Sequence, residues 1–177
     1  MLSAHPKLVK ASINLAHVQA VSTRTSLSIL ALLGASCSAA PAAQRQVSRG
    51  ETFTCTPVRV WDGDGPIWCA EGPKVRLAGI AAREMDGPCR AGHPCAAAAP
   101  VASRDYLASL IGRVTGTAKE GHLLVEGAAL TCTSNGSAGG SRTGAWCVSP
   151  RKGDLSCRMV QDGYAAKWDR YWREHRC

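Results

Sequence analysis

Apolar and polar residues alternate along several short segments of the chain, and this alternation predicts β-strands. Residues 53–71 contain two such runs on either side of the sequence Asp-Gly-Asp-Gly, which predicts a hairpin. A third strand is expected over residues 74–80. Two more are expected over residues 122–134 and 143–149, joined by a loop rich in glycine and serine.

Two segments have the periodicity of helices. Beyond Pro100, apolar side chains fall largely on one helical stripe, namely Val101, Tyr106, Leu107, Leu110 and Ile111. Asp154 is a predicted N-cap for a second helix that ends near Gly163. The order of three strands, a helix, two strands and a helix predicts an α+β fold that is mainly β. Five strands of this length around one core are typical of a small barrel.

The first 43 residues have the features of an export signal. They contain three Lys or Arg residues and no acidic residue, followed by a short apolar run and a stretch of small residues. We therefore expect a cleaved signal peptide over 1–43, a polar linker over 44–52 and a single domain over 53–177. The predicted location is secreted or periplasmic, without stable membrane insertion. An organellar leader and a lipoprotein attached through Cys37 stay open as alternatives.

Eight cysteines lie beyond the predicted leader, and an even number in an exported domain predicts disulfide bonds. Cys55 and Cys69 are equally distant in sequence from Asp62, and Cys132 and Cys147 flank the later loop in the same way. The suggested pairs are Cys55 with Cys69, Cys89 with Cys95, Cys132 with Cys147, and Cys157 with Cys177. A zinc site is the alternative, but the chain has no Cys-x-x-Cys pair and its histidines are not at ligand spacing.

The net charge adds a weak indication. The whole chain carries +8, and removing the three leader cations from the 21 Lys and Arg residues leaves 18 against 13 acidic residues, or +5. A modest basic excess suits an anionic partner such as nucleic acid, but many secreted domains have it for other reasons.

Four segments carry a resemblance to a known family. In chain order they are VWDGDG, VRLAGIAARE, the helix after Pro100, and SRTGAWCVSPRKGDLSCRMVQDGYA. Over residues 53–168 this order resembles the thermonuclease family, the staphylococcal-nuclease-like phosphodiesterases with an OB-fold. The resemblance implies a five-stranded OB-fold barrel and a monomeric, metal-dependent endonuclease that acts on DNA or RNA.

The resemblance also implies roles for individual residues. Asp64, with Asp62 beside it, would bind calcium. Arg76 and Arg142 would hold the scissile phosphate, where fixed guanidiniums stabilise the charge that builds up on its oxygens. Glu84 would orient or deprotonate the attacking water.

Three positions depart from the family pattern. Ala81 stands where the family has its second calcium carboxylate, Arg83 where it has a proline, and Gly65 where it often has a threonine. Calcium takes six to eight oxygen ligands, so losing a carboxylate should weaken the site unless it is rebuilt around Asp62 or Asp86.

The nuclease hypothesis has two alternatives. One is a catalytically degenerate OB domain of the cell envelope that binds nucleic acid or another anion. The other is a disulfide-rich structural or interaction domain. The basic, aromatic tail over residues 167–177 fits base stacking, but its spacing of three and four residues equally fits a helical face packed on the barrel, which we expect.

Overall fold

The computed structural model describes residues 45–177 of the chain, so the expected signal peptide over residues 1–43 and its Cys37 lie outside the described residues. The strands are β1 Thr52–Cys55, β2 Pro57–Val60, β3 Ile67–Cys69, β4 Lys74–Leu77, β5 Ile80–Ala81, β6 Arg113–Thr117, β7 Leu123–Glu126, β8 Leu130–Ser137, β9 Arg142–Ser149, β10 Gly153–Asp154 and β11 Ala166–Lys167. The helices are α1 Pro100–Ile111, α2 Leu155–Gln161 and α3 Asp169–Trp172. Within residues 45–177, no helix combines the length and the hydropathy that crossing a bilayer requires.

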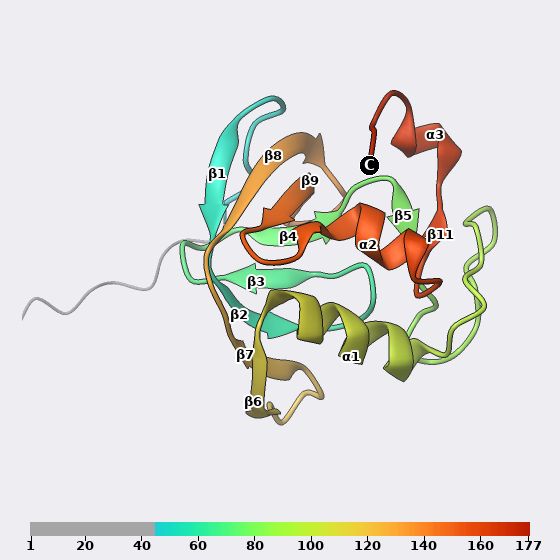
Figure 1. Cartoon of the computed structure of the whole chain (residues 1–177), viewed down its shortest axis with the longest axis horizontal. Helices are drawn as coiled ribbons and strands as arrows, with labels where there is room; N and C mark the ends of the chain where they lie inside the picture. The colour runs from blue at the N-terminus through green and yellow to red at the C-terminus, as the bar shows by residue number, and fades with distance from the viewer. Residues whose placement is uncertain (1–44) are drawn as a thin grey trace, which may run out of the picture. The chain divides into compact units, whose positions relative to one another are not determined.

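Most strands belong to one sheet (Figure 1). Its order is β1-β8-β9-β4-β3-β2-β7-β6, with β10 paired to β9, and β5 and β11 form a separate pair. The β4–β9 pairing is parallel, whereas its neighbours are antiparallel. The fold is therefore mainly β, as predicted. In the part of the chain that the structure describes, the sheet is an open path ending at β1 and β6, not the closed five-stranded barrel that the sequence led us to expect.

The first predicted strand is divided at one residue. Thr56 donates its backbone N–H and its hydroxyl to the Glu71 carboxylate, at 2.9 and 2.7 Å. On one side of Thr56, β1 pairs with β8, and on the other side β2 pairs with β3 and β7. One nearly continuous segment therefore contacts two different parts of the sheet.

The segment predicted as one strand over residues 122–134 is also divided, into β7 and β8. A Cβ on Gly127 would lie 1.8 Å from the Ile111 carbonyl oxygen, so the backbone passes the end of α1 too closely for any side chain. Strand β6 was not predicted because it lacks apolar alternation, and its Val114 is exposed. Strand β8 extends to Ser137, so the expected loop shortens to residues 138–141.

The polar segment expected as a linker packs along the sheet. Val47 is fully buried, and its backbone N–H donates to the Thr143 hydroxyl at 3.0 Å. The Ser134 hydroxyl donates to the Val47 carbonyl at 2.9 Å. Residues 45–51 are therefore held against β8 and β9.

The helices begin and end close to the predicted positions. Helix α1 starts at Pro100 and buries Leu107, Leu110 and Ile111, but Val101 is half exposed and does not belong to its buried face. The Asp154 carboxylate caps α2 by accepting the Cys157 backbone N–H at 2.8 Å. Helix α1 contacts β2, β6 and β7, α2 contacts β9, and the two helices contact each other.

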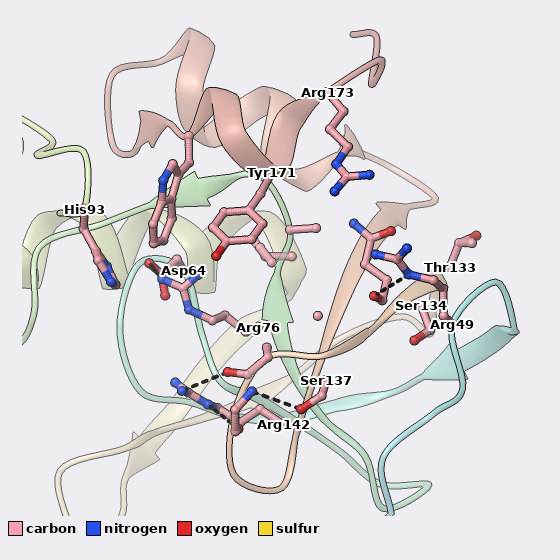
Figure 2. A pocket seen from close by; sticks show the side chains of 18 of the residues that line it. Arg49, Asp64, Arg76, His93, Thr133, Ser134, Ser137, Arg142, Tyr171 and Arg173 are labelled. Carbon is pink, nitrogen blue, oxygen red and sulfur yellow. Dashed lines mark hydrogen bonds and ion pairs between the residues drawn. The ribbon is translucent and has the colours of Figure 1, made fainter.

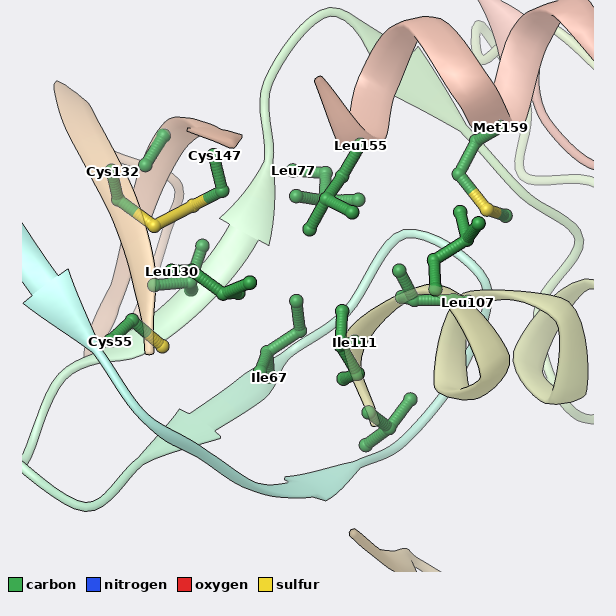
Figure 3. Close-up of a cluster of buried hydrophobic side chains, with 14 of the residues drawn as sticks. Cys55, Ile67, Leu77, Leu107, Ile111, Leu130, Cys132, Cys147, Leu155 and Met159 are labelled. Atoms are coloured by element: carbon green, nitrogen blue, oxygen red, sulfur yellow. A yellow bond between two sulfur atoms is a disulfide. The ribbon is translucent and has the colours of Figure 1, made fainter. Parts of the chain in front are cut away.

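The core lies between these helices and the sheet. Figure 3 shows Leu107 and Ile111 of α1 and Leu155 and Met159 of α2 facing Ile67, Leu77 and Leu130 of the strands. These side chains are almost completely excluded from water, and burying each aliphatic side chain contributes about 1.5–3 kcal/mol.

All four suggested disulfides are present, joining Cys55 to Cys69, Cys89 to Cys95, Cys132 to Cys147, and Cys157 to Cys177. Cys132 and Cys147 are also register partners in the β8–β9 ladder. Four disulfides in a domain of this size are typical of an oxidising, extracellular environment.

Candidate functional site

The turn between β2 and β3 places two aspartates in a buried position. Asp62 and Asp64 are each only 6% exposed. Gly65 has a φ of +109°, and a Cβ there would lie 2.5 Å from the Val75 carbonyl oxygen, so only glycine fits. A Cβ on Gly63 would lie 2.5 Å from the Ser103 Cβ. The glycine at position 65 is thus required by the close approach of β4.

Asp64 is the centre of a hydrogen-bond network. Its Oδ2 accepts from Arg76 Nη2 at 2.7 Å and from the Ala82 backbone N–H at 2.9 Å. Asp62 Oδ1 in turn accepts the Asp64 backbone N–H at 3.1 Å. Arg76 comes from β4 and also donates to the Ile80 carbonyl at 3.4 Å.

Burial changes the acidity of both aspartates. Removal from water, reinforced by the neighbouring Asp64 charge, raises the pKa of Asp62 to about 8. Burial also raises the pKa of Asp64, although the Arg76 guanidinium opposes this. At neutral pH Asp62 is therefore mostly protonated.

Glu84 and Arg142 reach the same region from distant parts of the chain. Glu84 follows β5, and its carboxylate pairs with Arg90 Nε at 2.8 Å. Arg142 begins β9, and the parallel β4–β9 pairing sets it beside Lys74, two residues before Arg76. Within residues 45–177 its guanidinium donates to carbonyls of the adjacent turn alone, those of Ala138 at 3.1 Å and Gly139 at 3.3 Å.

A cavity of about 740 Å³ brings these side chains together. Every site residue predicted from the sequence lines it, namely Asp62, Asp64, Arg76, Glu84 and Arg142. In Figure 2 the side chains of Asp64 and Arg76 lie next to each other, with the Tyr171 ring pointing toward them. Three segments far apart in sequence therefore supply one site.

Sequence reasoning missed several other residues of the cavity. Three more arginines line it, Arg49, Arg90 and Arg173, together with His93. Arg49 belongs to the segment expected as a linker, and Arg90 and His93 belong to the loop closed by the Cys89–Cys95 disulfide. The sequence offered one signal for these residues, namely that Arg90 directly follows Cys89, which was predicted to form a disulfide.

The aromatic tail over residues 167–177 both packs on the domain and lines the cavity. Trp172 is buried and packs on Trp146, with ring centroids 5.6 Å apart. Trp168 and Tyr171 instead line the cavity, and the Arg76 guanidinium lies 5.9 Å from the Trp168 ring centroid. The tail therefore packs through one face and contributes a wall of the site through another.

The positions that depart from the family pattern lie away from the cavity wall. Ala81 is fully buried in β5, where it pairs with Ala166. Arg83 Nε donates to the Ala96 carbonyl at 2.8 Å. Asp86 is exposed, and neither it nor Ala81 is among the residues that line the cavity.

The residues present do not supply a ligand set for calcium. Asp64 Oδ2 already accepts two hydrogen bonds and Asp62 Oδ1 accepts one, while burial favours the protonated form of both. Calcium requires six to eight oxygen ligands. Over residues 45–177 the one cluster with metal-ligand spacing is Asp154, Cys157 and His175, in which the sulfur of Cys157 is bound in a disulfide.

Comparison of the chain with family models, with curated proteins and with solved structures gave no match.

Proposed function

We propose that this chain is an exported phosphodiesterase of the thermonuclease type, which binds a nucleic-acid strand in the large cavity and cleaves its backbone. One observation carries the proposal. Arg142 is far in sequence from Arg76 and Glu84, yet all three line one cavity together with two aromatic rings. Cations, a carboxylate and aromatic faces are the groups that hold and hydrolyse a nucleic-acid phosphodiester.

The charge in the cavity supports an anionic ligand. Five arginines line it against three acidic residues, and burial keeps Asp62 mostly protonated at neutral pH. The local field is thus positive, which attracts phosphate and raises the rate of encounter.

In the proposed reaction, the phosphate accepts hydrogen bonds from Arg76 and Arg142, and Glu84 accepts a proton from the attacking water. The water oxygen bonds to phosphorus as the bond from phosphorus to one sugar oxygen breaks, and that leaving oxygen takes up a proton from solvent. Both Arg76 and Glu84 begin in ion pairs, with Asp64 and Arg90. A bound phosphate competes for Arg76 and Arg90, which releases Glu84 for the water. Asp64 can then take up a proton, because burial favours its neutral form.

The proposal includes an OB-like barrel. Strands β1 and β2 are separated only by Thr56, yet they stand at the two ends of the path β1-β8-β9-β4-β3-β2. A path that begins and ends on one bent strand is consistent with a small barrel, and β7 and β6 then extend it as a hairpin.

The proposal also includes export of a monomer through the leader over residues 1–43 to the periplasm or the exterior. The four disulfides support it, because they persist in those compartments. Because the residues present do not fit calcium, the proposal includes no bound calcium, and no step above passes through it.

A second function is favoured by a specific observation. Asp64 and Glu84 are both held in ion pairs, and Ala81 replaces a carboxylate, which suits a domain that binds nucleic acid without cleaving it. The two functions are distinguished by the role of Glu84.

The deciding experiment compares oxidised wild-type protein with Glu84→Gln for cleavage and binding of single-stranded DNA and RNA, in EDTA, calcium or magnesium. For a hydrolase, Glu84→Gln should lower cleavage by about 100-fold or more while affinity stays equal or rises, because the lost carboxylate repels phosphate. Glu126→Gln is the matched control, since Glu126 is an exposed partner of Arg113 outside the cavity. Binding without cleavage by the wild type under every condition would establish the non-catalytic function.

A further inference from the structure

A second cavity adjoins the proposed phosphate site. Its volume is about 410 Å³, and it shares Asp62, Glu84, Arg90 and Arg142 with the first cavity. Its remaining wall residues are Trp61, Gly65, Pro66, Trp68, Glu120 and His122. A strand whose phosphate lies at Arg142 therefore has this second cavity as the next space available to it.

Three aromatic rings form the wall of this cavity. The His122 ring centroid lies 4.8 Å from that of Trp61 and 4.5 Å from that of Trp68. All three side chains are only half-buried, so part of each ring faces the cavity. Trp61 directly precedes Asp62, and its backbone N–H donates to the Pro66 carbonyl at 3.2 Å, which ties the ring to the same turn that holds the aspartates.

The charge of this wall differs from that of the first cavity. Burial lowers the pKa of His122, and the neighbouring Arg59 lowers it further, so the imidazole is neutral at physiological pH. Glu120 adds a negative charge on the same wall, and Lys74 Nζ lies 5.4 Å from the Trp68 ring centroid. The three uncharged rings accept an uncharged planar group, because every nucleobase has a π-face that stacks on aromatic side chains.

We propose that Trp61, Trp68 and His122 form a stacking subsite for the nucleobase next to the phosphate held by Arg142. This inference rests on the proposed function in that it needs a nucleic-acid strand in the first cavity, but it needs no cleavage. In this arrangement the arginines of the first cavity bind the backbone of the nucleotide, and the aromatic rings of the second cavity stack on its base.

The test measures binding to two fluorescein-labelled oligomers of equal length in EDTA, a thymidine octanucleotide and the corresponding abasic deoxyribose-phosphate octamer. Stacking on an aromatic side chain contributes a factor of about 5 to 150 in affinity per base. Trp61→Ala and Trp68→Ala should each weaken binding of the octanucleotide by about 5-fold or more. Neither should change affinity for the abasic oligomer, whose phosphates still meet the arginines.

Two controls separate stacking from folding effects. Trp61→Phe keeps an aromatic face and should retain most of the preference for bases. Val148→Ala removes an exposed apolar side chain that lines neither cavity and should change nothing. Trp168 and Tyr171 are the same in the wild type and in all the variants. Any contribution that they make to base binding is therefore equal in each protein and does not affect the differences between them.

The outcomes distinguish this inference from the proposed function. If both tryptophan variants keep the wild-type preference for bases, or lose affinity for both oligomers equally, the subsite is refuted while the nucleic-acid function stands. If the wild type binds neither oligomer, both are refuted. If the wild type binds the octanucleotide without cleaving it, and the tryptophan variants lose affinity for this oligomer but not for the abasic one, the subsite is supported and only the hydrolase is contradicted.

Discussion

Arg76 donates from Nη2 to Asp64 Oδ2 across 2.7 Å, and their side chains are only 15% and 8% exposed. The pair joins a proposed phosphate ligand to a predicted metal ligand, so neither residue can be changed without affecting the other. Removing Arg76 from this buried pair leaves Asp64 either as a charge without compensation or as a carboxyl that must take up a proton, and both outcomes lose the ion pair.

We expect Arg76→Ala to lower the free energy of unfolding by roughly 2–4 kcal/mol, because Asp64 loses its cation. The double variant Arg76→Ala with Asp64→Asn should recover most of that loss. Urea denaturation of the oxidised proteins measures both. If the double variant is no more stable than the single one, the unpaired Asp64 is not the source of the lost stability.

Arg142→Gln tests the opposite case, a cation whose guanidinium donates to turn carbonyls of the adjacent loop. Stability should change by less than about 0.5 kcal/mol, whereas affinity for single-stranded DNA should fall and its dependence on the logarithm of salt concentration should decrease by about one ion. Arg113→Gln, an exposed arginine outside the cavity, is the control. An equal change of salt dependence in both variants would place the phosphate contact elsewhere.

Asp62→Asn tests the raised pKa. Asp62 titrates near 8 in the folded protein against 3.8 for an exposed aspartate, so between these pH values the folded state holds a proton that the unfolded chain has released. The free energy of unfolding therefore falls as pH rises through this interval. Asp62→Asn, which cannot ionise, should be roughly 1–3 kcal/mol more stable than wild type at pH 9.

The same variant should differ little from wild type at pH 4, where Asp62 is protonated in the fold. Thermal unfolding measured from pH 4 to 9 checks the sign. A stability difference that does not depend on pH would show that Asp62 keeps an ordinary pKa.

Ala81→Asp restores the carboxylate that the family pattern would place there. Because Ala81 is fully buried and pairs with Ala166 away from the cavity wall, we expect a loss of roughly 2–4 kcal/mol and no gain of cleavage in calcium. Ala81→Asn controls for size. A calcium-dependent rise in melting temperature or cleavage, seen in Ala81→Asp but not in Ala81→Asn, would mean that the carboxylate reaches a cation.

Two disulfides should have separable effects. Replacing Cys132 and Cys147 by alanine should cost about 3 kcal/mol, with little effect on ligand affinity per folded molecule, because the bridge lies in the core. Replacing Cys89 and Cys95 by serine should cost about 2 kcal/mol or less but should alter oligonucleotide affinity, because Arg90 sits beside Cys89. Equal affinity in the two folded variants would exclude Arg90 from the site.

Much of the fold followed from local pattern. The strand hairpin, the Asp154 cap and the four disulfides depend on residues close in sequence, and so they were predictable. The breaks at Thr56 and Gly127 were not, because they depend on the Glu71 carboxylate and on the backbone at Ile111, both distant in sequence.

The residues of the candidate site were predicted from a resemblance carried by four segments of the sequence. Asp62, Asp64, Arg76, Glu84 and Arg142 all line the cavity, and the parallel pairing of β4 and β9 accounts for the approach of Arg142 to Arg76. The ion pairs of Glu84 and Asp64 could not be foreseen, because Arg90 depends on the shape of a disulfide-closed loop and the Arg76 contact on the burial of the turn.

The disulfides join cysteines in the simplest possible order. Along residues 45–177 the cysteines are bonded in consecutive pairs, the first with the second, the third with the fourth and so on, across separations of 6 to 20 residues. A chain that enters an oxidising compartment from its N-terminal end can therefore form each native bond as soon as the second cysteine of the pair emerges. Correct pairing then follows from the order of arrival, and no wrongly joined cysteines have to be exchanged later.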